Sequence, residues 1–565
     1  MNTKCCSRAV AVFAFAAVLL AGSASAQVKF DRKVPLKKLL DGVNRLSPEV
    51  RKHLSPGMQN YLRYADALVN HSVTSGSMRS QTLSSSQASS SRSTQPSQSS
   101  SGPGGTVRVS DPALDPAKKG YTQTTTSSAW CGNSVVVGYE DTGAFFRTDP
   151  NDVFGVPISL DGISFSTDAG RSFTDLGFLT PGTFSANALL GDPVVTCSSP
   201  THFQYASILN TTTPDGLDPL IGPSISFSTD GGKSWSGPVQ GVSLDGNTEL
   251  ADKPWLAVDP THPPRMYLTY THIFFLACIN IELVSSSDAG KTWSAPTIVD
   301  RDCDNAGIGM VTGSTVVVSP GGTVYVAFEF FPVPPPGVNF VNSAIYFATS
   351  IDQGKTFSTP YKVSDVVRGG DGIQLNGHVF VDDYPQIAVD RSSGPSRGIV
   401  YITWPDARNK IVPDAIAPSG TYAYSDIFVA KSTNMGQSFK VLGAVSPTPK
   451  GFTGIGRDQF LPGIAVDKDG EVAVCYYDRR NDRNNLRVDR YCSVSEDQGK
   501  SWKDLRASNV NWMPAPDRDP LDPQPGNGIG EYDTLTSEFL LHSEGWFGAF
   551  EIEIGGNPDI VGKKF

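Results

Sequence analysis

Short apolar segments alternate with turns rich in Gly, Pro and polar residues from about residue 106 to the C-terminus, and this pattern repeats. Each repeat contains an apolar strand, a turn and a second apolar strand, and ends in a hairpin with a fixed sequence. Most repeats are about 60 residues apart, which is enough for a four-stranded blade with its loops. The pattern therefore predicts an all-β protein, namely a β-propeller of four-stranded blades.

The hairpin sequence is Ser-x-Asp-x-Gly-x-Ser/Thr-Trp/Phe, with Asn434 in place of Asp in the fifth copy. An Asp in a tight turn accepts hydrogen bonds from backbone N–H groups further along the chain, and Gly supplies a positive φ. No base or nucleophile accompanies the acid, so we interpret the motif as a structural element rather than a catalytic site. The six copies are residues 166–173, 228–235, 286–293, 350–357, 432–439 and 495–502.

The C-terminal stretch from about Ile529 to Phe565 repeats the first strands of the unit but lacks the hairpin motif. It offers about three strands, and Thr106–Ser110 could supply the missing outer strand. Closing a ring with strands from both ends of the chain removes an exposed sheet edge. We therefore favour seven blades, with six as the alternative.

The segment between residues 27 and 71 has a helical period instead. Leu36 and Leu40 recur at helical spacing, and Pro48 and Pro56 divide the segment into short pieces. The next stretch is almost entirely Ser, Gln, Thr and Gly, a composition that cannot bury a core and is typical of a disordered linker. The sequence thus predicts a signal peptide over 1–26, a helical segment over 27–71, a Ser-rich disordered linker over 72–105 and the propeller over 106–565.

The N-terminus indicates export. Lys4 and Arg8 precede an apolar run, and Ala24-Ser25-Ala26 fits a signal-peptidase cleavage site. No other apolar run is long enough to span a bilayer. We expect a secreted or periplasmic protein with no membrane span after the signal is removed.

Six cysteines remain after the predicted cleavage, an even number that favours disulfides in an exported chain. The spacing leaves the connectivity open. Position along the predicted strands favours three pairings, namely Cys475 with Cys492, Cys278 with Cys303, and Cys131 with Cys197.

The formal net charge is −10 for the whole chain, and no cluster of Lys or Arg stands out. This balance argues against a nucleic-acid partner and against binding to an anionic membrane surface. The seven histidines are scattered and the cysteine spacings are not those of a zinc site, so we predict no metal site of that kind.

Alignment of the repeats on their hairpins shows an acidic residue just before the inner strand of most blades. Inner strands line the central channel of a propeller, so these residues are expected to form a ring at one face. Such a ring could provide the carboxylates that hydrolyse a glycosidic bond. The ring positions are Asp192, Asp252, Asp383, Asp458 and Glu531, with Asp382 added, and the candidate catalytic residues among them are Asp252, Asp383, Asp458 and Glu531.

Arginines and aromatic residues lie near these positions in the sequence. Arg408, Arg457 and Arg479 are candidates for binding a substrate carboxylate, and Tyr384 and Tyr532 for stacking on a sugar ring. The competing interpretation is that each acid caps a turn or pairs with a neighbouring base, and we weight that at about two to one for any single residue. We expect no cofactor, with Ca²⁺ in the acidic ring as the alternative.

The six hairpins resemble the Asp boxes, or BNR repeats, of the sialidase superfamily, and the resemblance covers nearly all of residues 106–565. It implies the propeller fold and suggests an exported bacterial protein related to exo-α-sialidases. Sialidases of the well-known type also carry an Arg-Ile-Pro motif before the first box and three arginines for the substrate carboxylate. The closest string here, residues 145–150, keeps Arg147 but lacks Ile-Pro, and the arginine triad cannot be mapped.

Two functions follow. The leading hypothesis is an exported sialidase-like propeller that binds or hydrolyses a carbohydrate or glycoprotein ligand. The alternative is a non-catalytic binding or scaffold propeller for a protein or glycan partner, which the missing motif favours.

Overall fold

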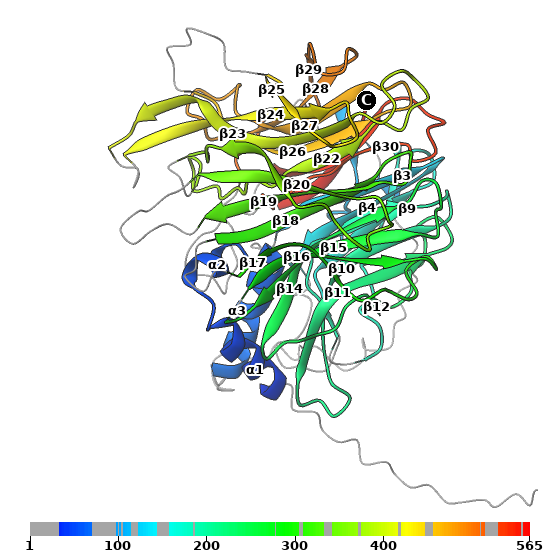
Figure 1. Cartoon of the computed structure of the whole chain (residues 1–565), viewed down its shortest axis with the longest axis vertical. Helices are drawn as coiled ribbons and strands as arrows, with labels where there is room; N and C mark the ends of the chain where they lie inside the picture. Colours follow the sequence, from blue (N-terminus) through cyan, green and yellow to red (C-terminus); the bar gives the residue numbers. More distant parts are fainter. Residues whose placement is uncertain are drawn as a thin grey trace, which may run out of the picture. The chain divides into compact units, whose positions relative to one another are not determined.

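The computed structural model describes most of the chain beyond residue 32 (Figure 1). The predicted signal peptide and nearly all of the predicted linker lie outside the described residues. The described residues are 33–70, 98–99, 101–102, 105–114, 122–143, 158–184, 187–276, 278–303, 309–332, 342–370, 374–415, 420–446, 456–508, 510–514, 529–554 and 557–565.

The strands confirm an all-β propeller that is preceded by short helices. They pair into seven sheets, and every sheet contains a run of antiparallel neighbours. The first three sheets are formed by β1 (Gln98–Ser99), β3 (Gln123–Cys131), β4 (Ser134–Asp141), β6 (Asp161–Ser166) and β7 (Phe173–Phe178); by β5 (Ile158–Ser159), β8 (Ala188–Leu189), β9 (Val194–Cys197), β10 (Phe203–Thr212), β11 (Pro219–Ser228), β12 (Val239–Gln240) and β13 (Leu244–Asp245); and by β14 (Glu249–Val258), β15 (Met266–Phe274), β16 (Ile279–Ser286) and β17 (Thr297–Asp302).

The remaining four sheets each have four strands. They are formed by β18 (Gly309–Val318), β19 (Val324–Pro332), β20 (Ser343–Ser350) and β21 (Tyr361–Val366); by β22 (Gln386–Val389), β23 (Val400–Pro413), β24 (Thr421–Ser432) and β25 (Lys440–Ala444); by β26 (Gln459–Val466), β27 (Val472–Asp478), β28 (Asp489–Ser495) and β29 (Lys503–Arg506); and by β30 (Leu535–Ser537), β31 (Trp546–Ile554), β32 (Asn557–Lys564) and β2 (Val107–Arg108).

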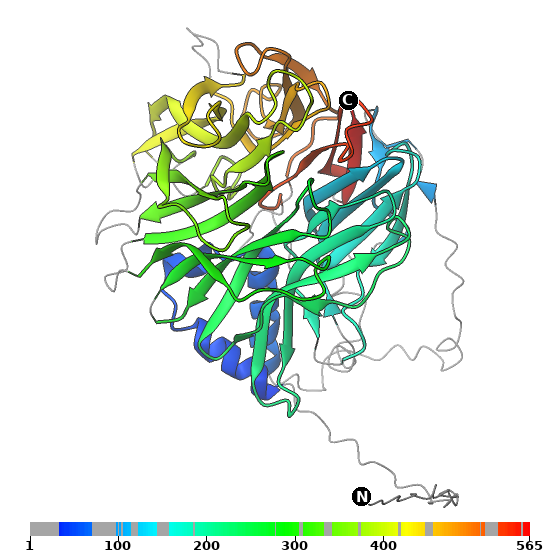
Figure 2. The same cartoon turned by 45° about the vertical axis from the view of Figure 1, so that its right-hand side comes forward.

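The sheets follow one another around a centre. The inner strands β3, β9, β14, β18, β22, β26 and β30 each contact the next, and β30 contacts β3 again. Figure 2 shows the sheets following one another around this centre in sequence order. The inner strands therefore surround one centre.

Both ends of the propeller sequence meet in one sheet. Val107 and Arg108 of β2 pair antiparallel with Gly562 and Val561 of β32, so the predicted contribution of residues 106–110 is confirmed. Two residues of the Ser-rich stretch also join the propeller, because Gln98 and Ser99 form β1 on the edge of β7. The propeller sheets thus include residues before the predicted boundary at residue 106.

The hairpin motif has the predicted hydrogen bonds. In the second copy, Asp230 accepts from the backbone N–H groups of Lys233 and Ser234 at 3.1 and 3.0 Å, and from the Ser228 hydroxyl at 2.8 Å. Gly231 and Gly232 have positive φ values of 81° and 92°, which residues with a Cβ rarely adopt. The motif is confirmed as a locally satisfied turn.

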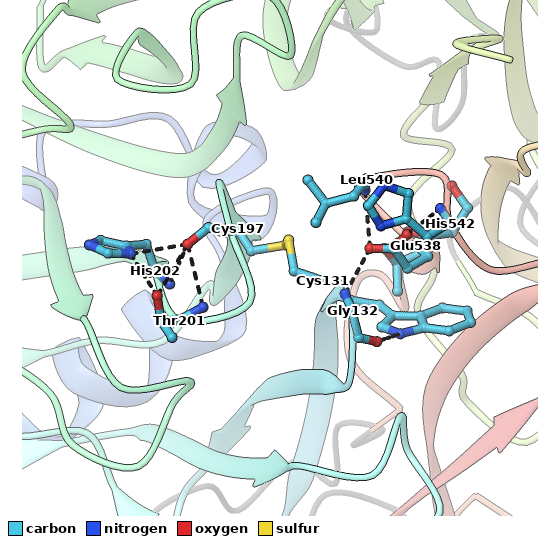
Figure 3. The surroundings of a disulfide bond; sticks show 12 residues. Cys131, Gly132, Cys197, Thr201, His202, Glu538, Leu540 and His542 are labelled. Carbon is cyan, nitrogen blue, oxygen red and sulfur yellow. Dashed lines mark hydrogen bonds between the residues drawn. A yellow bond between two sulfur atoms is a disulfide. The ribbon is translucent and has the colours of Figure 1, made fainter. Parts of the chain in front are cut away.

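Three disulfides join the six cysteines, and all three favoured pairings are confirmed. Cys131 at the end of β3 binds Cys197 at the end of β9, so this bond links two neighbouring sheets (Figure 3). Disulfides of this kind are typical of chains that fold in an oxidising compartment. The helices of the described residues contain no segment long and apolar enough to cross a membrane.

The predicted helical segment forms α1 (Lys33–Val43), α2 (Pro48–Lys52) and α3 (Pro56–Asn70). Pro48 and Pro56 each stand at the first helical position, where the missing N–H costs nothing. Leu39 and Met58 are completely buried, and they belong to the same hydrophobic cluster as residues of β14, β15 and β16. The helices, blue in Figures 1 and 2, thus pack directly on the propeller.

Candidate functional site

A buried acidic cluster lies where several inner strands begin. Its carboxylates are those of Asp192 before β9, Asp252 in β14 and Glu531 before β30, which are buried, and that of Asp382 before β22, which is partly buried. These acids influence one another electrostatically, which places them within one neighbourhood. The structure thus brings four of the six predicted ring acids together in this part of the propeller.

Lys253 lies at the centre of this cluster. Its ammonium group forms an ion pair with Glu531 and lies 4.7 Å from the ring centre of Tyr384. Its backbone N–H donates to Asp192 Oδ2 at 3.3 Å. Lys253 has a φ of 51° at an irregularity in the pairing of β14 with β15, so the backbone bulges where the lysine enters the cluster.

The N-terminal segment contributes two further residues. Ser55 directs both of its donors at Asp252, the backbone N–H to Oδ2 at 2.9 Å and the hydroxyl to Oδ1 at 2.8 Å. His53 contacts Asp382 through Nδ1 at 3.1 Å. The acidic cluster is therefore covered by the turn between α2 and α3.

Within the cluster, the pKa values of neighbouring carboxyl groups shift in opposite directions. Burial, with the adjacent charge of Asp252, raises the pKa of Asp192 to about 7. Burial also raises the pKa of Glu531 well above its ordinary value, although Lys253 opposes this. For Asp382, burial is outweighed by the hydrogen bond from His53 and by nearby positive charges, and its pKa falls. A group that holds a proton near neutrality thus shares the cluster with an ionised one.

Little free space remains in the cluster. Lys253, Trp255, Tyr384, Glu531 and Tyr532 are among the residues that line a cavity of only about 10 Å³. That volume corresponds to about one water molecule. A cavity of that size does not hold a sugar ring.

A second group of acids adjoins the first. Asp383 is 2% exposed and lies 3.6 Å from Arg368 Nε. Burial raises the pKa of Asp383 to about 8, and that of the neighbouring Glu329 well above its ordinary value. Asp383 is thus next to the cluster in sequence, but its cation is Arg368 rather than Lys253.

Asp458 belongs to a separate network. It accepts hydrogen bonds from Tyr422 at 2.7 Å and Asn485 at 2.6 Å, and lies 3.3 Å from Arg479 Nη1. Asp458 and Arg479 are both fully buried. These partners come from β24 and from the chain after β27, so the structure does not bring Asp458 or Arg479 into the cluster around Lys253.

The other two candidate arginines also lie elsewhere. Arg408 forms an ion pair with Asp406, two residues before it, and donates to Ser364 Oγ at 2.8 Å. Arg457 donates to the Ser446 carbonyl oxygen at 3.1 Å. The structure therefore does not bring these arginines to the acidic cluster, because they bind acceptors of their own and of neighbouring sheets.

Both candidate tyrosines do lie in the cluster. Tyr384 faces the Lys253 ammonium, and Tyr532 donates to the Pro193 carbonyl oxygen at 3.0 Å and packs edge-on against Trp255. Burial raises the pKa of each tyrosine well above its ordinary value, and neighbouring carboxylates add to this. Both phenols therefore remain neutral, and the hydroxyl proton of Tyr532 is already donated to Pro193.

Four contributors were missed as site residues from sequence, namely Lys253, Ser55, His53 and Arg368. Lys253 directly follows the ring acid Asp252, so its place in the sequence could have indicated that it belongs to the site. Ser55 and His53 lie about 200 and 330 residues before the acids they contact, and no local pattern indicates such a pairing.

Two larger cavities lie toward the other end of the inner strands, where β14 ends rather than where it carries Asp252. One measures about 200 Å³ and is lined mainly by the inner strands themselves. The other measures about 270 Å³ and is bordered by Arg391 and Phe539, whose ring centre lies 4.7 Å from the guanidinium. Neither brings several carboxylates together, so the acidic cluster is the stronger candidate for chemistry.

No group of three or more potential metal ligands occurs in the described parts of the chain. Lys253 supplies positive charge within the acidic cluster. The Ca²⁺ alternative stays a prediction.

Comparisons with known proteins return propellers at low similarity. No family model matches the chain, and no curated protein matches it. Solved structures of similar fold include an ulvan lyase of polysaccharide lyase family PL25, with 9% identity over 78% of this chain and 94% of that chain and a TM-score of 0.47. An α-L-arabinanase from Penicillium chrysogenum has 10% identity over 83% and 98% of the two chains, with a TM-score of 0.42. A Hadza microbial sialidase has 12% identity over 71% and 73%, with a TM-score of 0.38. Similarity at this level says nothing about the chemistry of this chain.

Proposed function

We propose that this protein is an exported propeller that binds and cleaves a carbohydrate at the acidic cluster around Lys253. The observation that carries the proposal is the convergence of Asp192, Asp252, Asp382 and Glu531 around Lys253, where the pKa of Asp192 is raised to about 7 and that of Asp382 is lowered. Cleavage of a glycosidic bond uses one protonated and one ionised carboxyl group.

The roles follow from the contacts. Asp192 is the proposed proton donor to the leaving oxygen, and Asp382 is the proposed base or nucleophile. Lys253 stabilises the ionised carboxylates and, in the finer proposal of sialidase-type activity, binds the carboxylate of the substrate. Tyr384 and Tyr532 offer neutral hydroxyls and ring faces to a sugar.

The alternative is a non-catalytic binding or scaffold propeller. Its support is that Ser55 and His53 already satisfy two acids of the cluster, which leaves room for about one water molecule. In that case the acids anchor the helices, and partners bind the outer surface.

Export and blade number belong to the same proposal. Three disulfides and the signal-like first 26 residues support a secreted or periplasmic location.

We count each of the seven sheets as one blade, because their inner strands contact one another in a closed sequence. The sialidase-like hairpins support the placement in that superfamily.

The test is hydrolysis and binding of a panel of sialosides and neutral glycosides by the purified full chain. We expect Asp192→Asn to lower turnover by about 10²–10⁴-fold, the range for loss of a general acid. Asp230→Asn, in a hairpin motif on the sheet edge, is the matched control and should retain activity. Binding without turnover on the whole panel would favour the alternative, and turnover that Asp192→Asn does not change would exclude the proposed acid.

A further inference from the structure

We propose that residues 33–70 form a displaceable cap that closes the acidic cluster, with Ser55 standing in for two adjacent hydroxyls of a sugar. This inference rests on the proposed carbohydrate function for the identity of the ligand. The covering of the cluster by the cap rests on contacts alone.

The contact between Ser55 and Asp252 has the form of ligand recognition. One residue presents two donors to the two oxygens of one carboxylate, at 2.8 and 2.9 Å. A sugar with hydroxyls on neighbouring carbons presents two donors in the same way. Because both partners are buried, a ligand that replaced Ser55 would have to supply both hydrogen bonds.

The start of α3 strengthens this contact. Ser55 precedes the helix, and its hydroxyl accepts from the Met58 N–H at 3.3 Å while donating to Asp252. The partial positive charge of a helix N-terminus favours a carboxylate at this position. His53 adds a second contact on Asp382, so two acids of the cluster are occupied by one short turn.

The cap can leave without breaking the propeller. Helices α1, α2 and α3 contribute no strand to any of the seven sheets. In the sequence, residues 71–97 separate the cap from β1 and are rich in Ser and Gln. Loss of the cap exposes apolar surface around Leu39 and Met58, so the closed state is the resting state.

Two glycines allow the cap to be lifted without altering the acids. A Cβ on Gly57 would lie 1.7 Å from the Leu190 carbonyl oxygen, a backbone atom that cannot swing aside. A Cβ on Gly42 would lie 2.3 Å from a ring carbon of Phe275. Neither glycine has a positive φ, so alanine is compatible with the helix itself.

The experiment compares the full chain with Gly57→Ala, using hydrogen exchange by mass spectrometry and calorimetric binding of sugars. We expect amides of α1 and α3 to exchange at least tenfold faster in the variant, while β27 keeps its protection. Asp66→Ala, an exposed position on α3, is the matched control and should exchange like the wild type. Gly42→Ala provides a second, independent way of lifting the cap.

The sugar probes are methyl α-D-mannopyranoside, methyl α-D-galactopyranoside and N-acetylneuraminic acid, each with a deoxy analogue that lacks one of two adjacent hydroxyls. Binding should strengthen about tenfold when the cap opens, and the deoxy analogues should not show this gain. If helices and β27 lose protection together, or if neither glycine variant opens the cap, the proposal is overturned. Equal sugar binding with open and closed cap also overturns it and leaves the proposed function intact. An opened cap with no sugar bound in any variant supports the cap and contradicts the carbohydrate function.

Discussion

Aspartates occur in two opposite environments in this protein, in the hairpin motifs near the surface and among the buried acids at the centre. Asp288 and Asp352, in the third and fourth motifs, accept several short hydrogen bonds near the surface, and their pKa values fall to about 2. Asp192 and Asp383 are buried, and their pKa values rise to about 7 and about 8. The acceptors of the first pair are satisfied within their own turns, whereas the second pair interacts with cations from neighbouring elements, Lys253 in β14 and Arg368 after β21.

The difference separates structural acids from candidate functional ones. An acid with a lowered pKa is ionised in the folded protein at neutral pH, and its turn gains from that charge. A buried acid with a raised pKa costs stability whenever it ionises, so a fold without a use for it would replace it.

Removing the central cation should destabilise the fold most. Lys253→Met leaves the Glu531 carboxylate without its ion-pair partner, and we expect a loss of about 3–5 kcal/mol in the free energy of unfolding. Lys233→Met, in the second hairpin motif, is the matched control. Its side chain is exposed, and the change should stay within about 0.5 kcal/mol. Urea unfolding of both variants measures this, and similar values for the two lysines would abolish the contrast.

The pH dependence of stability should differ in sign between the two regions. The folded protein holds the Asp192 proton up to about pH 7, whereas the unfolded chain releases it near its ordinary pKa of about 4. The folded state therefore binds more protons in this window, and stability falls as the pH rises from about 4 to 7. Each such group contributes a slope of up to about 1.4 kcal/mol per pH unit.

Asp192→Asn should flatten that slope, because the amide does not titrate and Asn tolerates the positive φ of 57° at this position. Asp288→Asn should act at the other end of the scale. Its folded pKa is lowered, so its stabilisation is present above about pH 4 and is lost as the pH falls toward 2. Thermal unfolding between pH 3 and 8 measures both, and a wild-type slope unchanged by Asp192→Asn would contradict the raised pKa.

Sequence patterns predicted the fold well because its signals are local. The hairpin motif carries its own hydrogen bonds, so its spacing set the register of the sheets, and the cysteines then paired as their strand positions indicated. The same register located Asp252 and Glu531 in the cluster. It could not separate Asp458, because that acid differs only in having Arg479 and Tyr422 as neighbours, which are brought to it by tertiary packing.

The cap shows most clearly what the sequence could not predict. Leu36 and Leu40 predicted a helix with a buried face, and both are buried. Helical periodicity says that a face is covered but not what covers it, so the approach of Ser55 to Asp252 was invisible in the sequence. Arg408 shows the converse error, since an arginine two residues after Asp406 was free to pair with it locally.

Truncating a hairpin aspartate should cost less than disturbing the centre. Asp230→Ala removes the acceptor for the N–H groups of Lys233 and Ser234, and we expect a loss of about 1–2 kcal/mol. Both N–H groups lie near the surface, where water can replace the lost acceptor. Chemical denaturation measures the loss, and a value above that of Lys253→Met would contradict the ranking of the two regions.

The smallest effect is expected for Asp230→Asn, which places in the second motif the Asn that the fifth motif has at the same position. Asn434 still accepts from the Ser438 N–H at 3.1 Å and from the Ser432 hydroxyl at 2.8 Å, and its amide donates to Ser438 Oγ at 2.9 Å. The amide thus preserves the turn and gives up the charge, which is worth little at a position close to water. We expect a loss below about 1 kcal/mol, smaller than for Asp230→Ala, with no effect on ligand binding at the centre. Denaturation of the two Asp230 variants side by side measures it. A loss as large for Asn as for Ala would mean that the charge itself, rather than the hydrogen bonds, holds the motif together.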